Sequence, residues 1–305
     1  PWTEQNHPEM LSKVLTDFPQ DILKSPAFLK HTPETHGDPY EIGTFIDEWG
    51  CIIENRQKGI IGEVKEPLLK DWSNIDKITP PKEWLSVDTD KINDFCKNTD
   101  KFVIAGCCPR PFERFQFIRG TENTLMDLSL NENDTKKLLT KLHDFYCELL
   151  EVWVKTDVDS FMFMDDWGSQ KSLLISPAMW RKFFKPLYKD YIDIAHSNNK
   201  KIFMHSDGYI IDIYPDLIEL GLDAINSQIF CMGLENLEKF KGQITFWGEI
   251  DRQYILPNGT QEQVRQAVDN IKKRLFQNGG VIAQLEFSPG AEPKNIYTAF
   301  EQWKD

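Results

Sequence analysis

Short apolar runs alternate with longer amphipathic runs from about residue 100 to the C-terminus. The short runs are typical of buried strands, and the longer runs have the spacing of helices with one apolar face. Strands are predicted, in chain order, at 101–107, 160–165, 201–205, 222–228, 244–249 and 280–286. Repeated strand-helix units of this kind form parallel sheets, because each helix returns the chain to the start of the next strand.

Two of the intervening stretches carry clear helix signals. Segment 176–197 begins with Ser176, a good N-cap residue, and has Pro177 at the first helical position. Segment 259–280 is opened by Thr260 and closed by Gly279. We therefore predict one helix in each segment.

The spacing of the units favours an α/β fold of the (β/α)8 or TIM-barrel type over a doubly wound sheet. No GxGxxG sequence follows any predicted strand, so the main signature of a dinucleotide-binding sheet is missing. The chain has 305 residues, a length at which such a barrel forms a single domain. We predict one barrel domain over residues 1–305, with the βα repeats in 100–305.

Residues 1–99 follow a different pattern. The segment 49–69 predicts an antiparallel hairpin or excursion with its turn near Lys58 and Gly59, and the proline-rich stretch 78–84 predicts a linker. We expect this part of the chain to supply a cap or lid together with the first barrel elements.

Composition and charge narrow the class of protein. Hydrophobic residues make up 40% of the chain and aromatic residues 12%, which indicates a globular protein. The net charge of −13 argues against nucleic acid or an anionic membrane as a partner. No apolar run approaches the roughly 20 residues of a membrane span, and the six cysteines are scattered without CxxC spacing. We expect a cytoplasmic protein.

Polar side chains gather at the ends of the predicted strands, where barrels of parallel strands carry their catalytic groups. They are Cys107 and Cys108, Asp165 and Asp166, His205 and Asp207, Asn226 and Gln228, Glu249 and Asp251, and Gln284 and Glu286. Every strand leaves the core through polar residues, so a single position supports a structural role as well as a functional one. Six polar ends in succession favour a functional site for the set.

His205 and Asp207 lie two residues apart, so in an extended strand both side chains point to one face. With Glu286 on another strand they form a set that can bind Zn²⁺, Mn²⁺ or Fe²⁺. The structural alternative makes His205 a hydrogen-bonded neighbour and Asp207 the cap of the following helix.

Asp165 and Asp166 are candidates for general acid-base catalysis, because neighbouring carboxylates raise each other's pKa. Adjacent residues of a strand point to opposite sides, so we expect at most one of them to face the cavity.

Three arginines, Arg110, Arg114 and Arg119, lie among aromatic residues directly after a predicted strand. They suit an anionic or planar substrate or a cofactor phosphate. Ion pairs with local acids such as Glu113 and Glu122 explain them equally well.

Several motifs resemble the uroporphyrinogen decarboxylase superfamily in their order and spacing. They are "MDDWGSQKSLLISPAMWRKFFKPLYK", "KKIFMHSDG", "INSQ", "FWGEIDRQYIL" and "GGVIAQLEFSPGAEPKNI". The segments "PFERFQFIRGTE" and "DEWGCIIENRQKGIIGEV" are similar to a decarboxylase-like subgroup of it. The resemblance implies a single (β/α)8 barrel with its site in the cleft at the strand C-termini.

The superfamily performs decarboxylation of uroporphyrinogen without a cofactor, and zinc-dependent methyl transfer from a methylated corrinoid protein to a thiol. In the methyltransferases a His-x-Cys pair and a later Cys hold the metal. The resemblance places His205 on the histidine, Asp207 on the first cysteine and Glu286 on the last. Carboxylates in place of thiolates favour harder metals and oxygen-rich substrates.

We predict a metal-assisted methyltransferase of the corrinoid-linked type that acts on a small molecule. A methylcorrinoid on a partner protein and a methoxylated or methylamine compound are both open as the methyl donor. Asp165 or Asp166 and Glu249 would be its catalytic residues, and Gln228, Asp251 and the three arginines would bind its substrate. Uroporphyrinogen decarboxylase is the first alternative, with the three arginines binding the substrate's carboxylates. Its motifs fit less well, because the first arginine of the chain is Arg56 and the "FSPG" segment lacks the family's histidine. A non-catalytic barrel that binds a ligand or a corrinoid protein is the second alternative.

Overall fold

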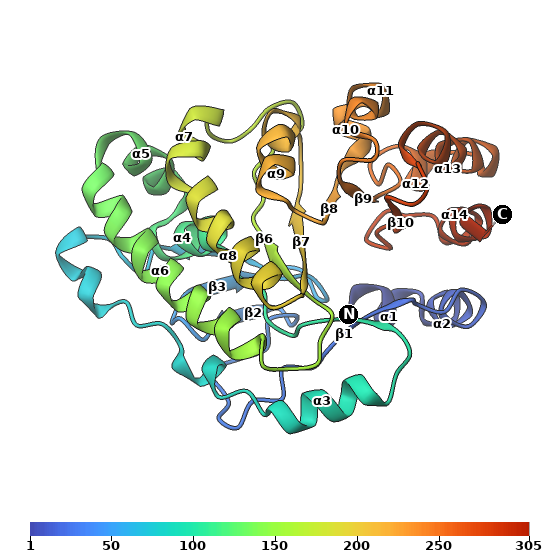
Figure 1. Cartoon of the computed structure of the whole chain (residues 1–305). Coiled ribbons are helices and arrows are strands. Elements are labelled where there is room, and N and C mark those ends of the chain that lie inside the picture. Colours follow the sequence, from blue (N-terminus) through green and yellow to red (C-terminus); the bar gives the residue numbers. More distant parts are fainter. Residues whose placement is uncertain (305) are drawn as a thin grey trace. The chain divides into compact units, whose positions relative to one another are not determined.

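The computed structural model describes residues 1–304, and the chain divides into two compact units (Figure 1). The first contains Ile22–Phe163 and Ala178–Lys201. The second contains Trp2–Asp21, Met164–Pro177 and the chain from Ile202 onward. Each unit is built on parallel strands, which confirms the α/β class.

The parallel strands of the first unit are β1 (Ile22–Lys24), β5 (Phe102–Ile104) and β6 (Ser160–Met164), paired in the order β1-β5-β6. Helix α6 (Glu132–Trp153) packs with α8 (Lys185–Ser197), and aromatic residues of β6 and α8 meet in the core, where the Phe163 and Tyr188 rings lie 4.6 Å apart. The helical elements are η1 (Trp72–Lys77), η2 (Lys82–Leu85), α3 (Thr89–Lys97), α4 (Pro111–Arg119), α5 (Thr121–Leu130), α6 (Glu132–Trp153), α7 (Pro177–Phe183) and α8 (Lys185–Ser197).

An antiparallel sheet of three strands also belongs to the first unit. Its order is β2 (Gly43–Ile46), β3 (Ile52–Asn55) and β4 (Glu63–Glu66). The loop between β3 and β4 contains Lys58 and Gly59, so the hairpin predicted in segment 49–69 is confirmed. The sheet has one more strand than the hairpin requires.

The second unit contains β7 (Lys201–Ser206), β8 (Ala224–Ser227), β9 (Thr245–Gly248) and β10 (Val281–Ala283), all parallel and paired in chain order. The register aligns His205 with Asn226 and Asn226 with Trp247, so the C-terminal ends of these strands lie side by side. The helical elements are α1 (Trp2–Asn6), α2 (Pro8–Asp17), η3 (Ile211–Ile213), α9 (Tyr214–Leu220), α10 (Ile229–Met232), α11 (Leu234–Leu237), η4 (Glu238–Phe240), α12 (Ile255–Asn258), α13 (Gln261–Leu275) and α14 (Pro293–Lys304).

All six predicted strands are present, whereas the three-residue β1 was not predicted. The single helix predicted at 176–197 is wrong, because α7 ends at Phe183 and α8 begins at Lys185. Pro186 lies in the first turn of α8, and its missing N–H cannot continue the hydrogen bonds of α7.

The second predicted helix is confirmed as α13. Thr260 forms a capping box with Gln263 at its start. The helix ends at Leu275, before the predicted stop at Gly279. Closure of the strands into an eight-stranded barrel stays a prediction.

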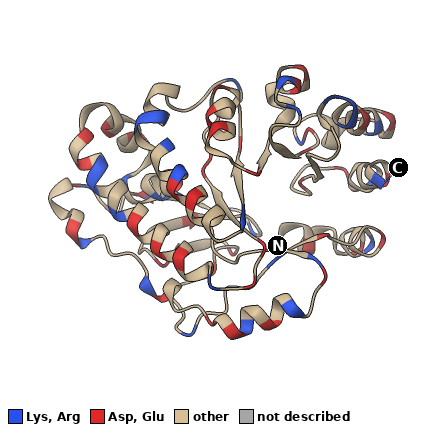
Figure 2. Cartoon of the chain, in the orientation of Figure 1, with Lys and Arg blue, Asp and Glu red and all other residues tan. Residues whose placement is uncertain are grey.

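Charged residues of both signs are interspersed along the helices, as Figure 2 shows for α6, α8 and α13. Many pair one turn apart, such as Lys136 with Glu132 at 2.8 Å. No helix within residues 1–304 is both long and apolar enough to cross a bilayer.

Candidate functional site

Two loops of the second unit approach each other so closely that glycine is required at their contact. The Gly168 N–H donates to the Asp207 carbonyl at 3.1 Å, and the Tyr209 N–H donates to the Ser169 carbonyl at 2.8 Å. Gly208 has a φ of +80°, and a Cβ on it would lie 2.1 Å from the Gly168 carbonyl oxygen. Because the loops follow β6 and β7, their contact brings the acidic residues at the two strand ends together.

Asp166, His205 and Asp207 form a cluster in which one ligand atom of each lies within 4.8 Å of the others. His205 Nε2 is 3.6 Å from Asp166 Oδ1 and 3.6 Å from Asp207 Oδ1. The Asp207 backbone N–H donates to Asp166 Oδ1 at 2.9 Å, which fixes that carboxylate. One imidazole nitrogen and two carboxylates are suitable ligands for a divalent metal ion.

The orientation of the His205 ring is set by Asn226 on the neighbouring strand. Asn226 Nδ2 donates to the Trp247 carbonyl at 2.7 Å and lies 3.3 Å from Gln284 Oε1. Its Oδ1 therefore faces His205 Nδ1, 2.5 Å away, and accepts that proton. The lone pair of a neutral His205 is then on Nε2, which points toward the two carboxylates. A hydrogen bond of this kind orients metal-binding histidines in proteins.

The two oxygens of Asp207 have different surroundings. Oδ2 forms an ion pair with Arg252 Nη2. Oδ1 is buried and has no hydrogen-bond partner among residues 1–304. The alternative in which Asp207 caps the next helix is wrong, since η3 has Ile210 at its N-cap and α9 has Ile213.

Glu286 pairs with Arg252 Nη1 and is not a member of the three-residue cluster. The same guanidinium nitrogen lies 3.9 Å from Glu249 Oε2. Arg252 thus joins two of the three residues predicted as metal ligands. Metal binding by Glu286 stays a prediction.

Glu249 is 4% exposed, and its Oε2 has no hydrogen-bond partner in the described part of the chain. Burial raises the pKa of Glu249 to about 7, and the nearby carboxylates of Asp207 and Glu286 act in the same direction. Arg252 and His205 oppose the rise. A carboxyl group with this pKa can give or take a proton near neutral pH.

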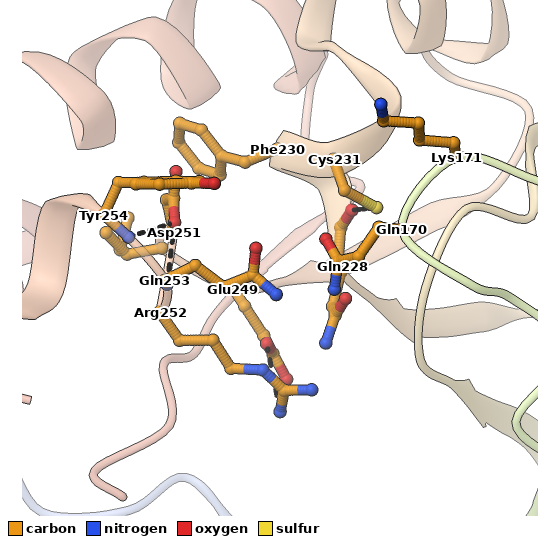
Figure 3. A pocket seen from close by; sticks show the side chains of 11 residues that line it. Gln170, Lys171, Gln228, Phe230, Cys231, Glu249, Asp251, Arg252, Gln253 and Tyr254 are labelled. Atoms are coloured by element: carbon orange, nitrogen blue, oxygen red, sulfur yellow. Dashed lines mark hydrogen bonds and ion pairs between the residues drawn. The ribbon is translucent and has the colours of Figure 1, made fainter. Parts of the chain in front are cut away.

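A pocket of about 480 Å³ adjoins these residues and includes three that the sequence predicted, Gln228, Glu249 and Asp251 (Figure 3). Gln228 Oε1 accepts the Gly208 N–H at 3.2 Å, which leaves its amide nitrogen available to a ligand. Asp251 Oδ1 accepts two backbone N–H groups, so this carboxylate is held in place. The other lining residues are Gln170, Lys171, Phe230, Cys231, Ile250, Arg252, Gln253 and Tyr254.

Of the two adjacent aspartates predicted for acid-base catalysis, one lies in the cluster. Asp165 is fully buried while Asp166 is in the cluster, as expected for adjacent residues leaving a strand.

The three predicted arginines belong to the first unit and form ion pairs there. Arg110 contacts Glu113 at 2.6 Å, Arg114 contacts Asp47 at 2.5 Å and Glu48 at 3.4 Å, and Arg119 contacts Asp127 at 2.7 Å. These contacts agree with the structural interpretation, and substrate binding by the arginines stays a prediction.

Arg252 was not predicted from the sequence, and Asn226 was predicted only as one of the polar strand ends, although each carries a signal. Asn226 is an amide at a strand end beside that of His205. Arg252 is a cation directly after the acidic strand end that contains Glu249 and Asp251.

Comparisons with known proteins place these features in a family context. The family model described as "Uroporphyrinogen decarboxylase (URO-D)" matches residues 33–305. A methyltransferase from Methanosarcina mazei is similar in structure, with a TM-score of 0.65 and 14% identity over 84% of this chain and 75% of that one. A B12-independent methionine synthase from Shewanella sp. W3-18-1 has a TM-score of 0.47 and 11% identity over 72% and 64% of the two chains. No curated protein matches the sequence. The likeness to the methyltransferase from Methanosarcina mazei shows the fold alone.

Proposed function

The chain belongs to the uroporphyrinogen decarboxylase family, and from that premise we propose that it is a metal-assisted methyltransferase of the corrinoid-linked type. The observation that carries the proposal is the cluster of Asp166, His205 and Asp207, in which the imidazole is already oriented as a ligand. The methyl group would come from a methylcorrinoid on a partner protein. The acceptor would be a small molecule bound in the 480 Å³ pocket.

The residues present fit a divalent metal ion. Asp207 Oδ1 is a buried acceptor without a hydrogen-bond partner among the described residues, and such an oxygen is costly to bury unless something binds it. His205 and Asp207 would be two ligands, with Asp166 or Glu286 as the third. A bound divalent ion would act as a Lewis acid toward the substrate. The imidazole suits zinc, and the carboxylates make manganese or iron alternatives.

The residues around the cluster would bind the substrate and move its protons. Glu249 lines the pocket and holds a proton near neutral pH, so it would exchange a proton with the group that accepts the methyl. The amide of Gln228 and the rings of Phe230 and Tyr254 would orient the substrate. In this proposal the strands belong to a closed (β/α)8 barrel, and the pocket lies at their C-terminal ends.

Decarboxylation of uroporphyrinogen is a second candidate, favoured by the family itself. Its substrate carries eight carboxylates, which require positively charged side chains. Arg252 and Lys171 are the cations that line the pocket, and Arg252 is paired with Asp207 and Glu286. The charge around the pocket therefore supports methyl transfer more than decarboxylation.

Metal analysis of protein purified without chelator tests the proposal. We expect about one divalent ion per chain, lost in His205→Ala and Asp207→Ala, because each removes a ligand. His143→Ala is the control, since His143 is also half-buried but pairs with Asp190 on the first unit. Metal-free protein that converts uroporphyrinogen would establish the second candidate and contradict the first.

A further inference from the structure

Arg252 lies at the centre of the charged groups of the second unit. Its Nη2 pairs with Asp207 Oδ2, its Nη1 pairs with Glu286 Oε2, and Nη1 is 3.9 Å from Glu249 Oε2. A guanidinium can hold two carboxylates at once because its N–H groups point in fixed directions. One side chain therefore controls the positions of two carboxylates that were predicted to bind metal.

The first consequence concerns Asp207. With Oδ2 paired to Arg252, only Oδ1 is free to face His205 Nε2, 3.6 Å away. Oδ1 has no hydrogen-bond partner within residues 1–304. Arg252 thus presents Asp207 as a ligand with a single oxygen, turned toward the imidazole.

The second consequence concerns the third ligand. Glu286 is held by Arg252 and lies outside the cluster, whereas Asp166 Oδ1 is 3.6 Å from the imidazole nitrogen. Asp166 is itself fixed by the backbone N–H of Asp207. The geometry places Asp166, and not Glu286, beside the two other ligands.

We propose that Arg252 is a positioning residue that selects the metal ligands. It keeps Glu286 out of the ligand set and orients Asp207, so that a divalent ion binds to Asp166, His205 and Asp207. The inference rests on the metal site of the proposed function. It goes further, because the family resemblance assigns the third position to Glu286.

The charge of Arg252 also affects the strength of metal binding. Its positive charge offsets the negative charges of Asp207 and Glu286 and repels a divalent ion at the cluster. Replacing Arg252 by glutamine would remove this repulsion and release Glu286. We therefore expect tighter binding in Arg252→Gln, with Glu286 as an additional ligand.

The test is competition between the metal-stripped full-length chain and a chromophoric chelator for Zn²⁺, which needs no methyl transfer. Asp166→Asn should weaken binding at least about tenfold, while Glu286→Gln should leave it within about twofold. Arg252→Gln should bind about tenfold more tightly, and the double variant Arg252→Gln/Glu286→Gln should lose that gain. Arg265→Gln is the control. Arg265 also pairs with a carboxylate, with 3.3 Å between its Nη2 and Glu301 Oε2, and this ion pair lies away from the cluster.

Each outcome decides the matter. If Zn²⁺ affinity falls strongly in Glu286→Gln and not in Asp166→Asn, each made in the otherwise native chain, the inference is overturned but the proposed metal site stands. Absence of Zn²⁺ binding by the native chain would remove the metal site and the role of Arg252 together. If Arg252→Gln fails to fold, Arg252→Lys replaces it, since one ammonium cannot span both carboxylates. Glu286→Gln should then weaken binding in the lysine background, and an unchanged affinity there would contradict the inference.

Discussion

Asn226 is predicted to set the metal affinity of the site without touching the metal. Its Oδ1 accepts the His205 Nδ1 proton at 2.5 Å, and its Nδ2 donates to the Trp247 carbonyl at 2.7 Å. Asn226→Leu keeps the number and branching of the side-chain heavy atoms and removes these hydrogen bonds, together with the one to Gln284 Oε1. The imidazole then loses the contact that fixes its tautomer and its direction.

The size of the effect can be worked out from these contacts. Loss of the partner that orients a metal-binding histidine costs about 10–100-fold in affinity, or about 1.4–2.7 kcal/mol. The substitution also leaves the His205 Nδ1–H and the Trp247 carbonyl without this partner, in a region where Asn226 is 8% exposed. At about 1–3 kcal/mol for each unsatisfied group, the free energy of unfolding should fall by roughly 3 kcal/mol.

Zn²⁺ titration and urea unfolding of the variant measure these two effects separately. Asn226→Asp is the informative companion, because its carboxylate still accepts the His205 proton and should keep metal affinity within a few-fold of native. Asn236→Leu is the control, since Asn236 is exposed on α11 and its Nδ2 donates to the Met232 carbonyl at 2.9 Å. Unchanged Zn²⁺ affinity in Asn226→Leu would refute the reasoning.

Three further substitutions test other parts of the account. Glu249 has a pKa of about 7 in the folded protein against 4.5 ordinarily, so the free energy of unfolding should fall as the pH rises from 4.5 to 7. Glu249→Gln should remove this pH dependence and raise the free energy of unfolding at pH 8 by on the order of 3 kcal/mol. The free energy of unfolding is measured by urea unfolding of chelator-treated native and variant protein at several pH values. An equal pH dependence in the two proteins would contradict this pKa. Gly208→Ala should lower the free energy of unfolding by about 2 kcal/mol or more in thermal unfolding and should also reduce metal binding. Gly290 is the control, with a φ of +92° and nothing within 4 Å of an added Cβ. Gly290→Ala should lower the free energy of unfolding only by the backbone strain. Similar losses for the two glycine variants would argue against the loop contact. Arg114→Met leaves the buried Asp47 carboxylate without its partner at 2.5 Å and should destabilise the chain by about 3–5 kcal/mol; a loss below 1 kcal/mol in urea unfolding would show that the pair contributes little.

The strands were predictable because their apolar runs are bounded by polar residues and separated by helical patterns. Strand β1 was missed because its apolar run is only Ile22 and Leu23, whereas the equally short β5 and β10 lie in longer apolar runs. The break between α7 and α8 had a visible cause in Pro186, yet the apolar spacing continues through it and suggests one helix.

The site was predictable only in part. His205 and Asp207 follow from the alternation of side chains along a strand. Asp166 joins them through the contact of two loops at Gly168 and Gly208, which no periodicity reveals. The role of Arg252 depends on where a long side chain turns, and sequence spacing carries no information about that.

We propose that the chain transfers methyl groups with the help of a metal held at Asp166, His205 and Asp207. The most direct measurement is the spectral change of free methylcobalamin on demethylation, with a panel of small thiol, amine and phenol acceptors. Native, metal-stripped and Zn²⁺-reloaded protein are compared. We expect methyl transfer that is lost when the metal is removed and restored when Zn²⁺ is added back. We expect none from His205→Ala at any metal concentration. Turnover that is unaffected by stripping, or that persists in His205→Ala, would contradict it.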